Sequence, residues 1–318
     1  MDIKRVIKAM QKYIVNPDYR FLINADFGKY DDMPDREYLE RKFKGYMGKA
    51  IDLDNPQTFN EKLQWLKLYD RRPEYTIMVD KYLVREYIKE KLGEEYLIPL
   101  IGVWDNPNDI DFKVLPNRFV LKCNHNSGLG MYICKDKSKL TSKDINGIRK
   151  NLVRGLAQNY YLTGREWPYK NVPRKIICEK YMEDTTIKYP LESKIIKSGE
   201  LPPLRDYKIY TFNGKAMLCM INQDRGIHTR ADYFDRDYNW LDFTWGYDHA
   251  DNLPAKPKNY ELMYELAEEL ASGTAELRVD FYEVNGRVYF GELTFFDGSG
   301  FDKIEPIEWD YKMGSMIQ

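Results

Sequence analysis

The sequence is poor in the residue types on which several common classes of site depend. It has three histidines and four cysteines in 318 residues, and no two cysteines form a C-x-x-C pair. A zinc site, which draws on clustered Cys and His ligands, is therefore not expected. The four cysteines lie in apolar, strand-like stretches, which predicts buried, reduced thiols and a cytosolic protein.

Long apolar runs and an excess of one charge are also missing. No stretch approaches the roughly 18 consecutive apolar residues of a membrane-spanning helix. The first residues lack the apolar core of a signal peptide. The 49 Lys and Arg residues nearly balance the 50 Asp and Glu residues, which argues against a molecule-wide field for nucleic acid or membranes. We therefore expect a cytoplasmic protein that binds no nucleic acid.

One amphipathic segment lies at residues 2–14, where apolar and basic side chains fall on different sides of a helix. We expect this helix to dock onto the protein's own core, and contact with an anionic membrane surface at the inner leaflet is the alternative. The apolar members are Ile3, Val6, Ile7, Met10 and Ile14, and the basic members are Lys4, Arg5, Lys8 and Lys12.

The order of the expected elements is that of an α+β protein. Helical periodicity dominates the first hundred residues: it predicts helices at Asp35–Met47, after the capping box Thr58–Glu61, and at Val79–Leu92. From Phe119 onward, short strands and Asn-Gly turns dominate, which is typical of antiparallel sheets. Helices packed on such sheets give the α+β class.

The most informative stretch is Leu277–Thr294, which reads as two strands joined by the turn Asn285-Gly286. Asp280 lies on the first strand and Glu292 on the second, each in an apolar, aromatic run. A lone carboxylate is costly to bury, but two carboxylates that converge across a hairpin can hold a hard cation such as Mg²⁺. The alternative is that both face water on an amphipathic sheet.

A glycine-containing loop, Asn124–Gly130, follows a strand that carries Lys122. Glycines let backbone N–H groups point at an anion, and the lysine could contact the same phosphate. The loop is neither a Walker A motif nor a dinucleotide fingerprint, because it returns into a strand rather than opening a helix. An ordinary hairpin is the alternative interpretation.

Taken together and in order, these segments resemble the ATP-grasp superfamily, and within it the TupA-like branch associated with bacterial surface-polysaccharide biosynthesis. The resemblance covers roughly residues 55–310. It implies an ATP-grasp fold, in which two α+β subdomains clasp the nucleotide. The units expected from it are an N-terminal helical extension (1–54), a helical region before the ATP site (55–116), a subdomain with the phosphate loop (117–182) and a subdomain with the Mg²⁺ site (183–318).

The resemblance implies a binding site for ATP. Asp80-Lys81 is similar to the family's D-K pair, whose lysine reaches the phosphates, and Lys122 matches the second phosphate lysine. The loop would close over the β- and γ-phosphates, and the stretch Ile176–Glu183 resembles the interlobe hinge that holds adenine and ribose. The implied nucleotide-binding residues are Lys81, Lys122, Asn126, Ser127, Gly128, Gly130, Glu179, Lys180, Met182 and, for the ribose, Glu183.

The final hairpin resembles the R-x-D and E-x-N motifs of D-alanine–D-alanine ligase-like enzymes. By this resemblance Asp280 and Glu292 bind Mg²⁺, and Thr294 takes the place of the usual Asn as a further ligand. Arg278 would stabilise charge on the reacting group and, with Lys122, is the implied catalytic residue. Substrate contacts are implied for Asp206, Lys208, Arg225, Gly298 and Ser299.

The reaction implied by the resemblance is ATP-dependent ligation of a carboxylate to an amine. The carboxylate attacks the γ-phosphate of ATP to give an acyl phosphate and ADP, and the amine then displaces phosphate to form an amide. The branch suggests a sugar-linked carboxylate or an amino acid as acyl donor, in the modification of a capsular or O-antigen-like polysaccharide or its precursor. Aromatic candidates for stacking on a sugar are Tyr233, Trp240, Trp245 and Tyr247, and ordinary packing in the core or on the surface is an equal alternative for them.

Two other classes of protein compete with the ligase. A sugar-nucleotide glycosyltransferase would use a D-x-D motif to bind a metal–diphosphate, and Asp109-Ile110-Asp111 and Asp235-Arg236-Asp237 match that pattern. The second class is a non-catalytic binding protein that has the same fold but no enzymatic activity. The converging charges expected at the ATP site argue against the second class, because a site without chemistry has no physical reason to keep them.

Overall fold

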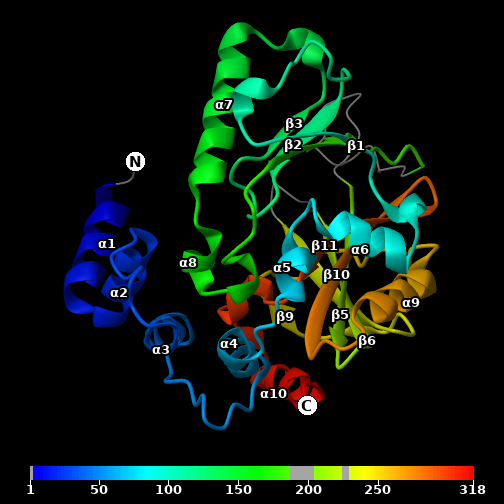
Figure 1. Cartoon of the computed structure of the whole chain (residues 1–318). Coiled ribbons are helices and arrows are strands. Elements are labelled where there is room, and N and C mark those ends of the chain that lie inside the picture. The colour runs from blue at the N-terminus through cyan, green and yellow to red at the C-terminus, as the bar shows by residue number, and fades with distance from the viewer. Residues whose placement is uncertain (1–2, 187–203, 224–228) are drawn as a thin grey trace.

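The computed structural model describes residues 3–186, 204–223 and 229–318 (Figure 1). Its described part is an α+β protein built around two main antiparallel sheets, as expected. The helices are α1 (Ile3–Val15), α2 (Pro17–Asp26), α3 (Asp35–Met47), α4 (Phe59–Tyr69), α5 (Glu74–Val79), α6 (Val84–Lys91), α7 (Ser142–Ala157), α8 (Tyr160–Gly164), α9 (Tyr260–Leu270) and α10 (Ile307–Met316).

Two antiparallel sheets form the body of the molecule, with α7 beside the first and α9 beside the second (Figure 1). The first sheet has the strand order β1-β4-β2-β3 and the second has the order β11-β10-β5-β6-β7-β8. The strands are β1 (Leu100–Trp104), β2 (Phe119–Cys123), β3 (Tyr132–Cys134), β4 (Ile176–Lys180), β5 (Asp206–Phe212), β6 (Lys215–Gln223), β7 (Arg230–Asp235), β8 (Trp240–Leu241), β10 (Glu276–Val284) and β11 (Arg287–Thr294). A short third sheet pairs β9 (Thr244–Trp245) with β12 (Ile304–Glu305).

The sequence signals for several elements are confirmed at the level of single hydrogen bonds. Thr58 Oγ1 accepts from the backbone N–H of Glu61, and the Glu61 carboxylate accepts from the N–H of Thr58, so the capping box opens α4. Both residues of the Asn285-Gly286 turn have positive φ, 51° and 75°. Because a type I′ turn requires this conformation, the expected β10–β11 hairpin forms as the sequence indicates.

The N-terminal helix does not dock onto the core, contrary to the expectation for residues 2–14. Ile7 is 51% exposed, Met10 is 61% exposed and Ile14 is 68% exposed. The helix α1 packs instead against α2, where the hydroxyl of Tyr13 donates to Asn24 Oδ1 at 2.8 Å. Amphipathicity therefore predicted the helix correctly but predicted the wrong position for its apolar side.

The helix expected at residues 79–92 begins only at Val84, as α6, and Val79 is instead the last residue of α5. The carboxylate of Asp80 accepts from the backbone N–H groups of Tyr82 and Leu83 at 2.8 and 3.2 Å, which stabilises the turn that precedes α6. The N–H of Lys81 donates to the carbonyl of Asn124, the first residue of the glycine-containing loop. The non-helical segment between α5 and α6 thus holds the Asp80-Lys81 pair against Asn124, just after β2.

Alternation along β2 and β4 gives the first sheet two chemically distinct faces. Leu121 and Cys178 are fully buried in a cluster with Leu152 of α7. Lys122 and Glu179, one position further along each strand, project from the opposite face. That face carries the two charged groups expected to contact the nucleotide.

Helix α7 approaches the glycine-containing loop more closely than any side chain would allow. A Cβ added at Gly155 would lie 2.7 Å from both Cys123 Sγ and the Cα of Gly130. Gly147, on the same helix, has no atom within 4 Å of the corresponding position. The two glycines of α7 are therefore a matched pair, one in a tight contact and one in open space.

We expect Gly155→Ala to lower the free energy of unfolding by about 1–3 kcal/mol, because Cys123 and the loop backbone must move apart. Gly147→Ala should instead raise it by up to about 1 kcal/mol, the ordinary gain in helix propensity. Urea denaturation of both variants measures the difference. Equal stability of the two variants would contradict the close approach of loop and helix.

The main hydrophobic core contains two of the aromatic residues considered for sugar stacking. Tyr233 of β7 and Trp245 of β9 are buried in it, and the Tyr233 hydroxyl donates to the Trp245 carbonyl at 3.0 Å. Trp240 and Tyr247 are exposed. The stacking hypothesis is therefore wrong for the first two residues and stays open for the other two.

Candidate active site

A β-bulge in the final hairpin brings the two predicted metal-binding carboxylates onto one face. Asp280 pairs directly with Glu292, but the register shifts at the next pair, where Gly291 is the extra residue. Phe290 and Leu293 are both buried in the core although they are three positions apart. Without the bulge, strict alternation could not bury both residues and also present Glu292 beside Asp280.

Arg278 is the centre of the site, buried and bound to three carboxylates. Its Nε and Nη2 atoms donate to the two oxygens of Asp280 at 2.6 and 2.9 Å, and Nη2 also donates to Glu292 at 3.0 Å. Its Nη1 donates to Asp297 at 2.5 Å. Thr294 lies opposite Arg278 in the hairpin and therefore on the same face. The predicted set of residues lacked Asp297, whose only signal is its position directly before the Gly298-Ser299 loop.

Lys208 belongs to this cluster rather than to a separate substrate segment. Its ammonium group hydrogen-bonds to Asp280 and lies 3.5 Å from Asp206, both of them buried. It reaches Asp280 because β5 pairs with β10 and places the two residues side by side. Arg225, the other charged residue expected to contact substrate, lies outside the described residues.

Lys81 connects the glycine-containing loop of the first sheet to the hairpin of the second. Its Nζ lies 3.2 Å from Glu292 Oε2 and donates to the carbonyl of Asn126, also at 3.2 Å. Burial alone would raise the pKa of Glu292, but Lys81, Arg278 and Lys208 together hold that pKa well below its ordinary range. Glu292 is therefore an ionised carboxylate at neutral pH, as a metal ligand must be.

The donor set fits a magnesium ion that arrives with a nucleotide. In the described parts of the chain, no group of three or more His, Cys, Asp or Glu side chains is arranged to hold a metal alone. Asp280 and Glu292 face each other and offer the oxygen ligands that Mg²⁺ prefers, while Mg²⁺ usually completes its shell with water and substrate phosphates. The residues present thus suit a metal held jointly by protein and phosphate.

The charged face of the first sheet carries an ion pair between two predicted nucleotide-binding residues. Lys122 Nζ lies 2.6 Å from Glu179 Oε2, and Arg85 of α6 lies 3.6 Å from the other oxygen. Glu179 is buried, so these two cations balance its charge. Arg85 carries no motif of its own, which is why the sequence did not single it out.

The hinge residues that follow are only partly free to meet a ligand. The N–H of Lys180 donates to the carbonyl of Pro99 at 2.9 Å, and its side chain is exposed. Glu183, the predicted ribose contact, forms an ion pair with Arg118. Met182 is half-buried beside them. A nucleotide that used Glu183 would have to displace or share Arg118.

The base of the glycine-containing loop is fixed and its tip is open. The side chain of Asn126 donates to the Gly155 carbonyl at 3.1 Å, so this predicted contact is engaged within the protein. Gly130 is buried with a φ of 77°, whereas Ser127 and Gly128 are exposed. Of the four predicted loop residues, the tip Ser127-Gly128 is the part positioned to meet a ligand.

The loop at Gly298-Ser299 is anchored by a lysine that the sequence did not reveal. Lys67 of α4 donates to the carbonyl of Ser299 at 2.7 Å and to its hydroxyl at 3.0 Å. Burial lowers the pKa of Lys67 to about 7, against the opposing charge of Glu166. A Cβ on Gly164 would lie 2.0 Å from the Ser299 hydroxyl. The expected substrate loop is thus held firmly between α4 and α8.

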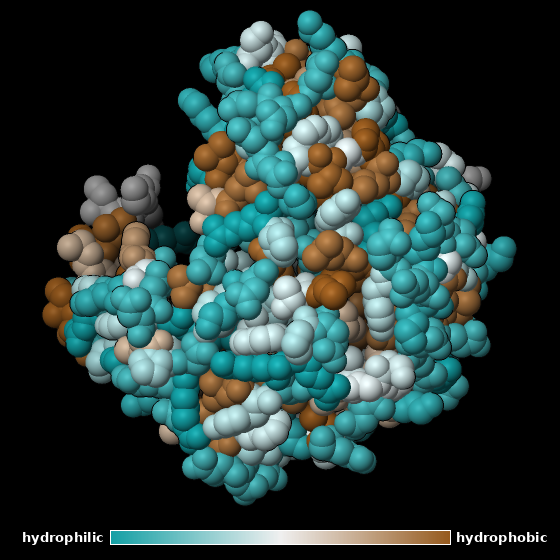
Figure 2. Space-filling view, viewed as in Figure 1, coloured by the Kyte–Doolittle hydropathy of each residue, from teal (hydrophilic) through white to brown (hydrophobic). Residues whose placement is uncertain are grey.

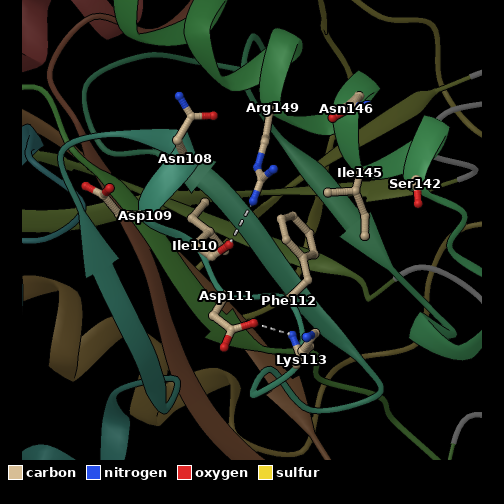
Figure 3. A pocket seen from close by; sticks show the side chains of 10 residues that line it. All are labelled: Asn108, Asp109, Ile110, Asp111, Phe112, Lys113, Ser142, Ile145, Asn146 and Arg149. Atoms are coloured by element: carbon tan, nitrogen blue, oxygen red, sulfur yellow. Dashed lines mark hydrogen bonds between the residues drawn. The ribbon is translucent and has the colours of Figure 1, made fainter.

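A surface pocket of about 420 Å³ lies apart from this cluster, beside α7 (Figure 3). Two of its lining residues, Asp109 and Asp111, form one of the D-x-D matches. Asp111 closes a turn by accepting from the N–H of Lys113, and Asp235 of the second match does the same for Asp237. Such turns need no metal, which weakens the glycosyltransferase alternative. The pocket is lined by Asn108, Asp109, Ile110, Asp111, Phe112, Lys113, Ser142, Ile145, Asn146 and Arg149.

Comparison with known proteins adds a family to this geometry. Residues 61–318 match the sequence model of the TupA-like ATPgrasp family. The chain is also 30% identical over 111 residues to a lipoteichoic acid synthase of Staphylococcus saprophyticus; the match covers 34% of this chain and only 16% of that relative's length.

Similar solved structures include two D-alanine–D-alanine ligases. The enzyme from Helicobacter pylori has 14% identity and a TM-score of 0.42, covering 82% of this chain and 69% of its own. The enzyme from Bacillus anthracis, complexed with ATP, has 16% identity and a TM-score of 0.42, covering 76% of this chain and 65% of its own.

Proposed function

Because this chain belongs to the TupA-like ATP-grasp family, we propose that it is an ATP-dependent ligase that joins a sugar-linked carboxylate to an amine. The proposed acyl donor is a sugar acid or an amino acid. The proposed product is an amide on a capsular or O-antigen-like polysaccharide or on its precursor. The proposed setting is the cytoplasm, at the inner face of the cell envelope.

The observation that carries the proposal is the balanced cluster around Arg278. Three carboxylates contact Arg278, and Lys208 and Lys81 approach two of them. A metal–nucleotide complex can bind in such a site by replacing some of its ion pairs. The carboxylates would then bind Mg²⁺, and the lysines would bind phosphate. Catalysis of phosphoryl transfer is mostly positioning and charge neutralisation of this kind.

Each residue then has a proposed task in the reaction. Bound ATP and Mg²⁺ would supply the phosphoryl group that activates the carboxylate as an acyl phosphate. Asp280 and Glu292 would hold the metal, and Lys81 and Lys122 would bind the phosphates. Arg278 would remain beside the reacting carbonyl and stabilise the charge that develops there when the amine attacks.

Calorimetric titration with Mg²⁺ and a non-hydrolysable ATP analogue tests this proposal, with UDP-sugars titrated in parallel. We expect the ATP analogue to bind and the UDP-sugars not to bind. Lys122→Ala should lower the affinity for the ATP analogue by about tenfold or more, because a charge-assisted contact to phosphate is lost. Lys150→Ala, an exposed lysine of α7, is the matched control and should bind normally.

The outcomes separate the candidate functions. Binding of a UDP-sugar alone would make the glycosyltransferase the better interpretation. Unchanged affinity of Lys122→Ala would remove the phosphate-binding role of that face. A search for the carboxylate and amine by ADP release follows only if the analogue binds.

A further inference from the structure

The helix α1 presents an uncovered apolar side at the edge of the molecule. Figure 1 shows α1 at the far left, away from both sheets, and Figure 2 shows apolar surface on the same part of the molecule. Val6, Ile7, Met10 and Ile14 are all exposed although each is apolar. Successive residues of an α-helix are about 100° apart, so these four side chains lie on one side of α1. The exposed side is therefore a continuous stripe rather than scattered apolar residues.

The charge of α1 indicates what kind of surface the stripe fits. The helix carries Lys4, Arg5, Lys8 and Lys12 and no acidic residue, whereas the whole chain has nearly equal numbers of basic and acidic residues. The same rotation of about 100° per residue places the basic positions on the side opposite the apolar stripe. A cationic helix with a separate apolar stripe is suited to lie in the interface of an anionic bilayer.

Contacts with α2 leave this stripe available. Tyr13 donates to Asn24, and Arg20 of α2 donates to the carbonyl groups of Tyr13 and Ile14 at the end of α1. These contacts attach the helix by its C-terminal end and by the edge that bears Tyr13. None of the described helices is long and apolar enough to cross a membrane, so α1 would rest on a bilayer and not span it.

We propose that α1 docks the protein onto an anionic phospholipid bilayer, with the stripe of Val6, Ile7, Met10 and Ile14 inserted among the lipids and the basic residues beside the head groups. A second copy of the chain fits the stripe less well, because its own α1 carries the same positive charge and repels. The proposal does not rest on the ligase function, since α1 lies outside the residues that match the family.

Co-sedimentation of the full chain with lipid vesicles tests the proposal. We expect binding to vesicles of phosphatidylcholine mixed with phosphatidylglycerol, little binding to phosphatidylcholine alone, and release as the salt concentration rises. The double substitutions Ile7→Ser with Met10→Ser and Lys8→Glu with Lys12→Glu should each lower the partition coefficient by on the order of tenfold or more. Val114→Ser with Val153→Ser, which alters two exposed valines elsewhere, is the matched control and should bind like the parent protein.

Further readouts keep the result interpretable. Circular dichroism checks that the α1 variants remain helical, and the ATP-analogue affinity should not change, so a failure of the ligase proposal would show separately. Absence of vesicle binding by the parent chain would overturn the docking proposal. So would equal binding to both vesicle types, normal binding by both α1 variants, or a parent dimer that the Ile7→Ser, Met10→Ser variant converts to a monomer.

Discussion

Glu292→Gln is expected to lower Mg²⁺-dependent turnover by on the order of a hundredfold or more while the protein stays folded. Glutamine keeps the shape of the side chain but removes the charge that a metal ligand must carry. Arg278 retains its bonds to Asp280 and Asp297 in this variant, so the cluster loses the charge that Glu292 shares with Arg278 and Lys81 but keeps its centre. Function should therefore suffer far more than stability.

Release of ADP in the presence of candidate carboxylates and amines measures the loss, and thermal unfolding checks the fold. Glu265→Gln, at an exposed position of α9, makes the same chemical change away from the site and should keep full activity. Normal turnover by Glu292→Gln would show that Glu292 is not a metal ligand. The hairpin would then lack the proposed chemistry although the chain belongs to the family.

Arg278→Met is expected to have the largest effect on stability, lowering the free energy of unfolding by about 3–5 kcal/mol. The substitution keeps much of the side-chain volume but leaves Asp280 and Asp297 without their main partner. Burial raises the pKa of Asp280, and Arg278 counteracts that rise. Without the guanidinium group the pKa of Asp280 should move further upward.

The sign of the pH dependence follows from this shift. A carboxylate whose pKa is lower in the parent protein than in the variant favours the parent at pH values above both pKa values. The deficit of Arg278→Met should thus be largest near neutral pH and shrink as acid protonates Asp280. Urea denaturation at neutral and mildly acidic pH measures it, with Arg278→Lys as the control that keeps the charge but loses the bidentate bond. A constant deficit across that range would show that packing, rather than charge, explains the loss.

Signals that act within a few residues predicted local structure well. The bounds of α3 agree with those expected, the Thr58–Glu61 capping box opens α4, and the Asn-Gly turn closes the final hairpin. Each depends on neighbouring backbone groups that the sequence specifies directly. The turn sets the pairing only as far as Phe281 with Phe290, and the pairing of Asp280 with Glu292 depends in addition on the extra residue Gly291.

Partners that are distant in sequence could not be read from it. Lys67 meets Ser299 across 232 positions, and Arg85 of α6 meets Glu179 of β4, which also lies far along the chain. The non-helical segment at Asp80 depends similarly on Asn124. The position of α1 was predicted wrongly for a related reason. An apolar stripe shows that one side of a helix favours an apolar partner, but it does not identify that partner.

The extra residue at Gly291 separates the length of the chain from the position of its carboxylates. Removing that glycine would let strict alternation after Phe290 place Glu292 opposite Asp280 and Leu293 in the core, which is where the bulge already holds them. Filling the position is harder than removing it, because a Cβ at Gly291 would lie 3.0 Å from the carbonyl oxygen of Asp280. Among relatives of this protein, a regular strand without this residue could therefore carry the same pair of carboxylates.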